Sequence, residues 1–301
     1  MDKIAIAVKR SKWERDLIRY GSPDEVKKIY RIQNNAFSKI FESHQRQKES
    51  LRALQKRLNG ARYLHREELP HCDFSEFDCL ISLGGDNHFV YVSQFADSRL
   101  KVIGINSDPL TSSGALLYFD TESLVSKLPN DMQNIQLTTE SWTRIDCELI
   151  YPSGKSIKTF PAISEISIHS AFSDYISRYL IRINLEKWEE QKSSGLLLST
   201  GVGSTGWFMN CHWSHLQEQS IFRKDANFFR LIARELPATK TYRFHLATVE
   251  AEEKLELVSE MDGEVVIDAH PDSTYDFPPG CRALFSLSKE KLEVITDISS
   301  R

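Results

Sequence analysis

A short apolar run that ends in two glycines and an aspartate constrains the fold of this chain more than any other feature. Residues 79–83 read CLISL, and Gly84-Gly85-Asp86 follow directly. Such a run favours a buried strand, and the glycines permit a sharp turn into a following helix. The pattern therefore predicts a strand–turn–helix unit of the kind found in α/β folds.

Other segments in the first part of the chain extend this pattern. Three short segments are further strand candidates: residues 4–8, 61–64 and 102–105. A heavily charged stretch over residues 23–58 favours helix and ends at Asn59-Gly60, a common helix terminator. Strands that alternate with helical segments predict an α/β domain with a mostly parallel sheet over residues 1–125.

The pattern changes after about residue 128, where strand candidates dominate. Residues 152–155 read PSGK, a turn signal between two strands, and apolar and polar residues alternate along residues 179–185. A segment near residues 216–235 favours helix and interrupts the strands. We therefore predict a β-rich domain over residues 126–282, and strands near residues 283–301 that return to the first domain.

The bulk composition narrows the class of protein. A formal net charge of −4 over 301 residues and a pI near 6.2 argue against a general nucleic-acid binder. No run of about 18 apolar residues occurs, so we expect no membrane-spanning helix. The N-terminal residues, MDKIAIAVKR, enter a strand pattern at once and leave no room for a leader peptide.

The cysteines are scattered and odd in number. The five lie at positions 72, 79, 147, 211 and 281 without a CxxC pair, which predicts reduced thiols in a cytoplasmic protein, unless an organellar targeting segment has been trimmed. Cys211, His212 and His215 could face one another on a helical turn. Because a fourth ligand at metal-site spacing is missing from the sequence, we predict ordinary packing there and no metal site.

The first glycine loop, ISLGGDN at residues 81–87, has a chemistry suited to phosphates. Glycine lets the backbone approach a phosphate closely, and free N–H groups at a helix start favour anions. An aspartate would repel phosphates, so it is better suited to polarise an attacking hydroxyl or to help hold Mg²⁺. The structural alternative is a tight turn in which Asp86 caps the following helix.

The second glycine loop, SSGLLLSTGVGSTGW at residues 193–207, contains the pattern GxGxxG. In a Rossmann fold this pattern opens a βαβ unit, and an acidic residue follows on the next strand about twenty positions later. Here residues 224–230 favour helix, and the surrounding sequence is rich in strands. The sequence therefore favours a Gly/Ser/Thr loop that contacts ribose or phosphate over a Rossmann dehydrogenase.

Together, five motifs in order resemble the NAD kinase family, and particularly its mitochondrial-type branch. They are GGDN at 84–87, GINSDP at 104–109, SEISI at 164–168, QKSSGLLLSTGVGSTGW at 191–207 and MDGE at 261–264. The resemblance implies a two-domain fold with the nucleotide in the cleft between the domains. It implies a kinase that uses ATP and Mg²⁺ to phosphorylate the 2′-hydroxyl of the adenosine ribose of NAD, giving NADP. It also implies a homodimer.

The resemblance assigns a role to individual residues. Asp86 becomes the catalytic group that activates the ribose hydroxyl, and Glu165 becomes an acceptor for ribose hydroxyl groups. The other residues expected to contact NAD are Gly85, Asn106, Ser164, Ser194, Thr205 and Trp207. The residues expected to contact the phosphates of ATP are Gly84, Gly85, Asn87 and His88. The structural alternatives are a solvent-facing carboxylate for Glu165 and a core position for Trp207.

Several positions depart from the pattern of the family. Asn87 stands where glycine is usual, although asparagine tolerates a positive φ better than most residues. His88 replaces a small hydroxyl residue and is expected to place a bulky, titratable group beside the phosphates. Ser164 replaces the asparagine of an Asn-Glu pair. Two alternatives therefore stay open: a protein that binds NAD or NADP without efficient phosphoryl transfer, and a related lipid kinase with a GGD loop.

Overall fold

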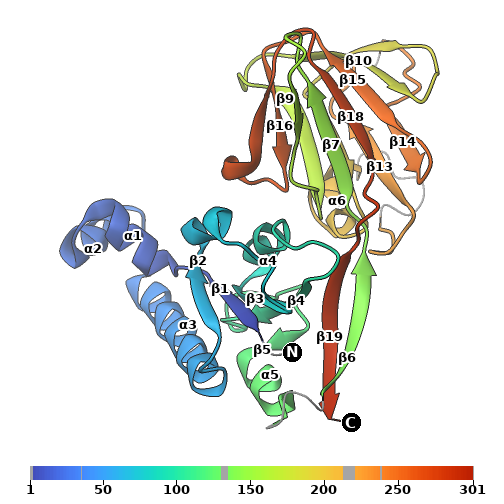
Figure 1. The fold of residues 1–301 in the computed structure, drawn as a ribbon. Helices are drawn as coiled ribbons and strands as arrows, with labels where there is room; N and C mark the ends of the chain where they lie inside the picture. The colour runs from blue at the N-terminus through green and yellow to red at the C-terminus, as the bar shows by residue number, and fades with distance from the viewer. Residues whose placement is uncertain (1–2, 35, 130–134, 213–220, 238, 301) are drawn as a thin grey trace. The chain divides into compact units, whose positions relative to one another are not determined.

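The chain folds into two compact units that differ in architecture (Figure 1). The computed structural model describes residues 3–34, 36–129, 135–212, 221–237 and 239–300. The first unit comprises Met1–Glu140 and Glu293–Arg301, and the second comprises Ser141–Leu292. The second unit is thus an insertion in the sequence of the first, and the chain passes between the units twice.

The first unit is built on a seven-stranded, largely parallel sheet in the order β2-β1-β3-β4-β19-β6, with β5 paired to β4. Its strands are β1 (Ile4–Val8), β2 (Arg62–His65), β3 (Cys79–Gly84), β4 (Lys101–Asn106), β5 (Phe119–Asp120), β6 (Ile135–Trp142) and β19 (Leu292–Ser300). The strands β1 to β5 pair in parallel, and β19 runs parallel to β4. The predicted α/β sheet is therefore confirmed.

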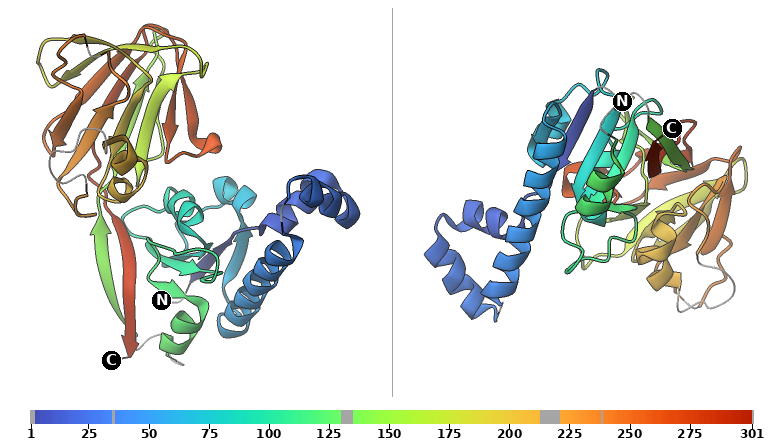
Figure 2. Two further views of the ribbon diagram at one scale, coloured as in Figure 1. Left: turned by 180° about the vertical axis from the view of Figure 1, so that it is seen from behind. Right: turned by 90° about the horizontal axis from the view of Figure 1, so that it is seen from below.

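Helices complete the first unit. They are α1 (Lys12–Tyr20), α2 (Pro23–Ile32), α3 (Phe37–Arg57), α4 (Asp86–Ser93) and α5 (Thr121–Lys127), with a 3-10 turn η1 (Arg66–His71). The helices α1 and α2 and the start of α3 pack around Trp13, Val26 and Tyr30, whereas Leu54 near the end of α3 belongs to the core on the sheet. The views in Figure 2 show α1 and α2 together at one end of the unit. None of the helices among the described residues is long and apolar enough to cross a membrane.

The second unit consists of two antiparallel sheets of six strands each. One has the order β11-β10-β15-β18-β7-β8, and the other has the order β14-β13-β12-β9-β16-β17. The strands of the first are β7 (Ile145–Ile150), β8 (Ser156–Lys158), β10 (Ser177–Ile183), β11 (Glu189–Ser193), β15 (Leu255–Ser259) and β18 (Arg282–Leu287). Those of the second are β9 (Glu165–Ser170), β12 (Leu196–Ser199), β13 (Phe228–Ala233), β14 (Leu246–Glu250), β16 (Gly263–Ile267) and β17 (Thr274–Phe277). Both sheets contribute to one hydrophobic core, so the unit is a sandwich.

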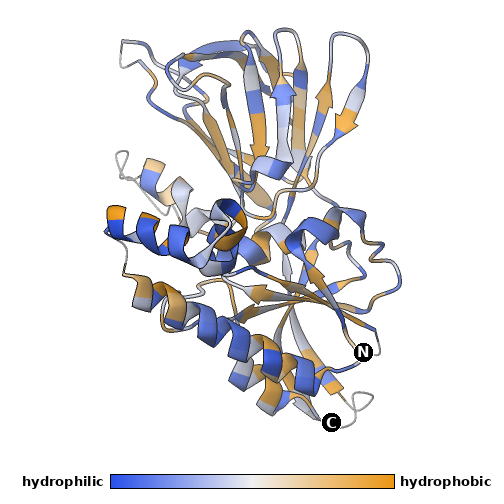
Figure 3. Cartoon of the chain, turned by 90° about the vertical axis from the view of Figure 1, so that its left-hand side faces the viewer, coloured by the Kyte–Doolittle hydropathy of each residue, from blue (hydrophilic) through white to orange (hydrophobic). Residues whose placement is uncertain are grey.

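The hydropathy of the strands follows these two environments. The central strands β1 and β3 of the parallel sheet are buried at every residue, whereas β10 in the sandwich alternates between buried and more exposed positions. Figure 3 shows the same contrast, with mixed colours along the strands of the sandwich. A parallel sheet covered on both faces requires continuous apolar strands, and a sandwich strand needs only one apolar face.

Two predictions about the second half need correction. We expected helix near residues 216–235, but β13 is a strand that pairs with β12 and β14. Its residues Phe229 and Leu231 fill the sandwich core, which a local helical preference could not reveal. The part of that segment at residues 213–220 lies outside the described residues. In addition, β18 pairs with β15 and β7, so β19 alone of the last two strands pairs in the first sheet.

Candidate functional site

The first glycine loop joins the buried strand β3 to the helix α4. The strand ends at Gly84, Gly85 takes the N-cap position in an extended conformation, and α4 begins at Asp86. This confirms the strand–turn–helix prediction. The alternative in which the Asp86 side chain caps the helix is wrong, because the N-cap position has no side-chain hydrogen bond and Asp86 is already helical.

The Asp86 carboxylate is held by a second loop of the same unit. It accepts hydrogen bonds from the backbone N–H of Ala115 at 3.0 Å and of Leu116 at 2.9 Å. A carboxylate has about four lone-pair sites, so these two bonds fix its orientation and leave acceptor capacity for a ligand. Asp86 is half-buried, and its carboxylate is therefore oriented without being sealed into the core.

Asn106 shapes the loop that holds Asp86. It is 7% exposed and ends β4, and its side-chain amide donates to the carbonyl of Ser112 at 2.8 Å. Its side-chain oxygen accepts from the N–H of Asp108 at 3.1 Å. Gly114 packs so closely that an added Cβ would lie 2.7 Å from the amide nitrogen of Asn106. The predicted contact of Asn106 with NAD stays a prediction, while its hydrogen bonds place it inside this loop.

His88 lies in the core of the first unit and not at the surface of the loop. Its side chain is 3% exposed, and its Nε2 atom lies 3.1 Å from the carbonyl oxygen of Ala7 in β1. A Cβ on Gly84 would lie 2.7 Å from the imidazole ring, so the glycine makes room for it. The expectation that the ring stands beside the phosphates is wrong, because successive helical residues turn by about 100° and position 88 faces the sheet.

Asn87 occupies the first turn of α4 and is exposed. It is not among the residues with a positive φ. The missing glycine therefore requires no strained backbone at this position, and the loop keeps the geometry that an ordinary residue allows. Its predicted contact with phosphate stays a prediction.

In the second unit, the Gly/Ser/Thr loop packs directly against Ser164. The N–H of Thr200 donates to the carbonyl of Ser164 at 3.0 Å, and the Thr200 hydroxyl donates to the carbonyl of Ile163 at 2.6 Å. A Cβ on Gly203 would lie 2.4 Å from the Ser164 carbonyl oxygen, and one on Gly201 would lie 1.9 Å from that of Arg223. These two glycines of GxGxxG therefore permit close backbone packing within the unit, a different use from the Rossmann turn.

Asp268 fixes the backbone that carries Ser164 and Glu165. It follows β16, is 5% exposed, and accepts from three consecutive amides, those of residues 163, 164 and 165, at 3.1, 2.8 and 2.9 Å. Its own N–H donates to the carbonyl of Glu165 at 2.8 Å. Sequence reasoning missed this residue, because its partners lie about 100 positions away and no local motif marks it.

Glu165 is an acid of the candidate site with a raised pKa. It begins β9 and is partly buried, so the alternative of a solvent-facing strand carboxylate is wrong. Burial raises the pKa of the Glu165 carboxyl to about 7, and the neighbouring Asp268 carboxylate acts in the same direction. A carboxyl group that titrates near neutral pH is typical of functional sites and suits an exchange of protons or hydrogen bonds with a bound hydroxyl.

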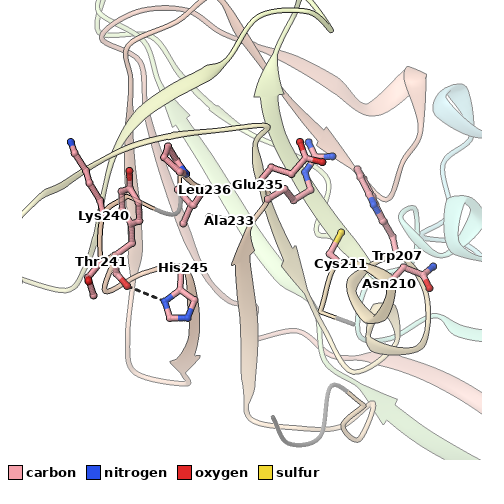
Figure 4. A pocket seen from close by; sticks show the side chains of 12 residues that line it. Trp207, Asn210, Cys211, Ala233, Glu235, Leu236, Lys240, Thr241 and His245 are labelled. Carbon is pink, nitrogen blue, oxygen red and sulfur yellow. Dashed lines mark hydrogen bonds between the residues drawn. The ribbon is translucent and has the colours of Figure 1, made fainter. Parts of the chain in front are cut away.

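A pocket of about 780 Å³ lies in the second unit beside Trp207 (Figure 4). Trp207 opens α6 (Trp207–His212) and is 36% exposed, so the core alternative is wrong. The Arg234 guanidinium lies 4.8 Å from the centre of its ring and donates to the carbonyl of Ser194 at 2.5 Å. The Ser194 hydroxyl in turn donates to the carboxylate of Glu235. Trp207 lines the pocket, and Arg234 connects it to Ser194.

The lining of this pocket combines aromatic and basic groups that sequence reasoning did not identify. It consists of Trp207, Asn210, Cys211, Ala233, Arg234, Glu235, Leu236, Pro237, Lys240, Thr241, Tyr242 and His245. Arg234, Lys240 and His245 supply basic groups beside two aromatic rings, a combination suited to a planar ring that carries phosphate. The Cys211 thiol lines this pocket, whereas His215 lies outside the described residues.

The predicted site residues fall into two groups, one in each unit. The first group is Gly84, Gly85, Asp86, Asn87, His88 and Asn106, and the second is Ser164, Glu165, Ser194, Thr205 and Trp207. Within the second group, the backbone around Ser164 supports the loop that carries the exposed Thr205. The cleft between the two groups stays a prediction.

Comparison with known proteins gives consistent relatives at low identity. No model of a known protein family matches the chain. Mitochondrial NAD kinase 2 of Rattus norvegicus is 25% identical over 254 residues, covering 69% of this chain and 60% of that protein. The Homo sapiens protein of the same name is 24% identical, and the match covers 69% of this chain and 57% of that protein. An NAD kinase of Clostridium kluyveri is 26% identical over 160 residues, covering 53% and 54%. The chain therefore spans about three fifths of the length of these mitochondrial relatives.

Solved structures share the fold. An NAD kinase from Archaeoglobus fulgidus in complex with ATP has a TM-score of 0.57 at 17% identity and covers 99% of this chain and 93% of that one. Yeast NADH kinase complexed with NADH has a TM-score of 0.67 at 12% identity, and the match covers 99% of this chain and 84% of that one. The parallel α/β sheet followed by two antiparallel sheets is thus the architecture of these enzymes.

Proposed function

We propose that this chain, which belongs to the NAD kinase family, transfers the γ-phosphate of ATP to the 2′-hydroxyl of the adenosine ribose of NAD. The relatives of similar sequence are named for NAD kinase activity, and the two structural neighbours hold ATP and NADH. The observation that carries the proposal is the Asp86 carboxylate, which follows two glycines at the end of a buried strand and is oriented by two amides.

Asp86 serves as the group that accepts the proton of the attacking hydroxyl. Phosphoryl transfer depends mainly on positioning the nucleophile and stabilising the charge on the phosphate, and a fixed carboxylate supplies the first of these. Gly85 leaves the backbone at the start of α4 without a side chain, so phosphate oxygens can approach it. The amides of Ala115 and Leu116, which donate to the Asp86 carboxylate, prevent it from rotating away from the nucleophile.

The residues of the first loop also fit Mg²⁺ brought in with ATP. This ion prefers oxygen ligands and is usually held by one or two carboxylates together with substrate phosphates. Asp86 offers such an oxygen, with acceptor capacity beyond its two amide bonds. When bound there, the ion would neutralise charge on the transferred phosphate.

The second unit supplies the groups for NAD. Asp268 fixes the backbone at Glu165 by accepting hydrogen bonds from the amides of residues 163–165. Once ionised, the Glu165 carboxylate accepts hydrogen bonds from ribose hydroxyls. Ser164 and Thr205 offer further polar contacts. Trp207 provides a ring face for stacking at the edge of the 780 Å³ pocket, next to a basic side chain.

The assembly and location of the protein are part of the same proposal. The homodimer rests on the resemblance to the family, and the cytoplasmic location rests on the scattered cysteines, which are free thiols at all five positions. Light scattering coupled to gel filtration measures the first: a mass near 34.6 kDa, that of one chain, would refute the dimer.

The test is formation of NADP by purified protein given NAD, ATP and Mg²⁺, read with an NADP-specific coupled dehydrogenase. Asp86→Asn should lower kcat by about 100- to 10,000-fold, because the isosteric amide keeps the shape and loses the base. Asp97→Asn is the matched control, since it removes a half-exposed carboxylate of the same unit that pairs with Arg99. Turnover of Asp86→Asn equal to that of the control would remove Asp86 from its role.

The alternative of a binding protein without phosphoryl transfer loses its motivation in the structure. It rested on Asn87 and His88, and the first has ordinary helical backbone while the second is buried against β1. Tight NAD binding by calorimetry with no NADP produced would nevertheless select it. Turnover of a lipid acceptor in place of NAD would select the lipid kinase alternative.

A further inference from the structure

The helix α3 is bonded to the loop that holds Asp86. This loop, residues 107–118, leaves β4 and returns to β5, and we call it the Asp86-holding loop. The Ser50 hydroxyl of α3 donates to the carbonyl of Ser107 at 3.0 Å. The N–H of Ser107 donates to the carbonyl of Gly84 at 3.0 Å, so the start of the loop is tied to both the helix and the glycine turn.

Asp108 is the centre of the connection between α3 and the loop. It is 3% exposed and accepts from the Arg46 guanidinium at 2.7 and 3.3 Å and from the hydroxyls of Ser43 and Thr111. Arg46 and Ser43 lie one turn apart on α3, and Thr111 lies within the loop. One buried carboxylate therefore joins two elements that are more than 60 residues apart in sequence.

The loop transmits this anchor to Asp86 through its own backbone. The N–H groups of Thr111 and Ser112 donate to the carbonyl of Asp108, both at 3.2 Å, and a Cβ on Gly85 would lie 3.5 Å from the Ser112 hydroxyl. The chain then turns at Gly114, whose φ of +59° favours glycine. The next two amides are the donors to the Asp86 carboxylate.

Asp108 is ionised in this setting. Burial alone would raise the pKa of its carboxyl, but hydrogen bonds from Arg46, Ser43 and Thr111 outweigh burial and hold the pKa below its usual value. Asp108→Asn removes the charge and leaves one acceptor oxygen in place of two, so Arg46, Ser43 and Thr111 cannot all keep their hydrogen bonds to this side chain. The element best placed to move is the loop, because the Thr111 hydroxyl bonds the carboxylate from within it.

We propose that Asp108 is a positioning residue for Asp86: its ion pair with Arg46 of α3 fixes the Asp86-holding loop, whose amides at 115 and 116 aim the catalytic carboxylate. The proposal rests on the proposed function for the role of Asp86. A misplacement of about 1 Å in a reacting group costs up to about 100-fold in rate. A slight shift of the loop should therefore lower kcat. Most of the proposed NAD contacts lie in the second unit and are untouched, so KM for NAD should change less than kcat.

The test compares Asp108→Asn with Glu256→Gln in the full chain. Glu256 is the matched control, because it is also a buried carboxylate, 6% exposed, held by two arginines, Arg182 and Arg282, but it lies in the second unit. Asp108→Asn should lower kcat by about 10- to 100-fold with KM for NAD within about twofold of the parent. Glu256→Gln should leave kcat and KM unchanged even where it lowers the melting temperature.

Amide hydrogen exchange measured by NMR gives a readout that does not depend on activity. In Asp108→Asn the amides of Ala115 and Leu116 should exchange at least about tenfold faster than in the parent, and in Glu256→Gln they should not. Parent-like exchange at these two amides overturns the proposal, whatever the rate of turnover. If the parent makes no NADP, the proposed function fails, and faster exchange still supports the anchoring of the loop. If Asp108→Asn does not fold, Arg46→Gln is the second variant. It removes the same ion pair, but from a side chain that is 28% exposed. The kinetic constants and the exchange of the two amides are measured on it in the same way.

Discussion

Replacing Glu165 by glutamine should stabilise the folded protein above neutral pH. Burial and the Asp268 carboxylate raise the pKa of the Glu165 carboxyl from 4.5 to about 7. Between these two values the folded state keeps a proton that the unfolded state has lost. Stability therefore falls as pH rises through this window, and the rise in pKa corresponds to roughly 3 kcal/mol of unfolding free energy at pH 8. Glutamine removes the ionisation and should recover most of that amount.

The assay is urea denaturation followed by tryptophan fluorescence at pH 4.5 and pH 8. The Glu165→Gln variant should exceed the parent by roughly 3 kcal/mol at pH 8, and the difference should shrink toward zero at pH 4.5, where both carboxyl and amide are neutral. Glu190→Gln is the control, because this glutamate is exposed on β11. A gain of equal size at both pH values, or a loss of stability at pH 8, would refute the assignment of a raised pKa to Glu165.

The same substitution should weaken NAD binding. An ionised carboxylate accepts hydrogen bonds from ribose hydroxyls, and these bonds are stronger than those of a neutral amide. Affinity of the parent for NAD, measured by calorimetry, should therefore increase as pH rises through about 7. In Glu165→Gln this pH dependence should disappear, which separates the role in binding from the effect on stability.

Substitutions at three further positions test the placement of the site residues. His88→Leu should lower the melting temperature, at a cost of about 1–3 kcal/mol from the lost hydrogen bond to Ala7, and leave KM for ATP within twofold. Gly203→Ala should destabilise the protein by about 1–3 kcal/mol in urea titrations, because its Cβ would lie 2.4 Å from the Ser164 carbonyl oxygen. Trp207→Ala should raise KM for NAD by about 5- to 10-fold, whereas Trp207→Phe should keep most of the stacking; equal KM values for the two would argue against a ring contact.

The sequence predicted the elements whose signals are local. The apolar run at 79–83 and the two glycines after it correctly gave a buried strand, a turn and a helix, because burial on both faces leaves a continuous apolar pattern. The position of Asp86 at the start of that helix followed from the same pattern. Its partners did not, because Ala115 and Leu116 lie about 30 residues further along the chain.

Features that depend on long-range packing escaped prediction. The direction of His88 depends on where α4 begins, since a shift of one residue would turn the ring by about 100°. The strand β13 depends on the neighbours that flank it, β12 and β14, and its own residues gave no sufficient signal. Asp268 and Arg234 act on residues about 100 and 40 positions away, and no motif connects such pairs.

The return of β19 to the first sheet has a consequence for biosynthesis. The strand lies at residues 292–300, beside β4 at residues 101–106, so the ribosome makes the whole sandwich before the sheet can gain this strand. Residues 141–292 form a continuous unit and can fold as soon as they emerge. The edges of β4 and β6 that pair with β19 stay open for the time needed to add about 150 residues, roughly 10–30 s at typical rates. During that interval two strand edges of the nascent chain are open to pairing with other chains. Chaperones should therefore bind ribosome-bound chains most strongly while these edges are open.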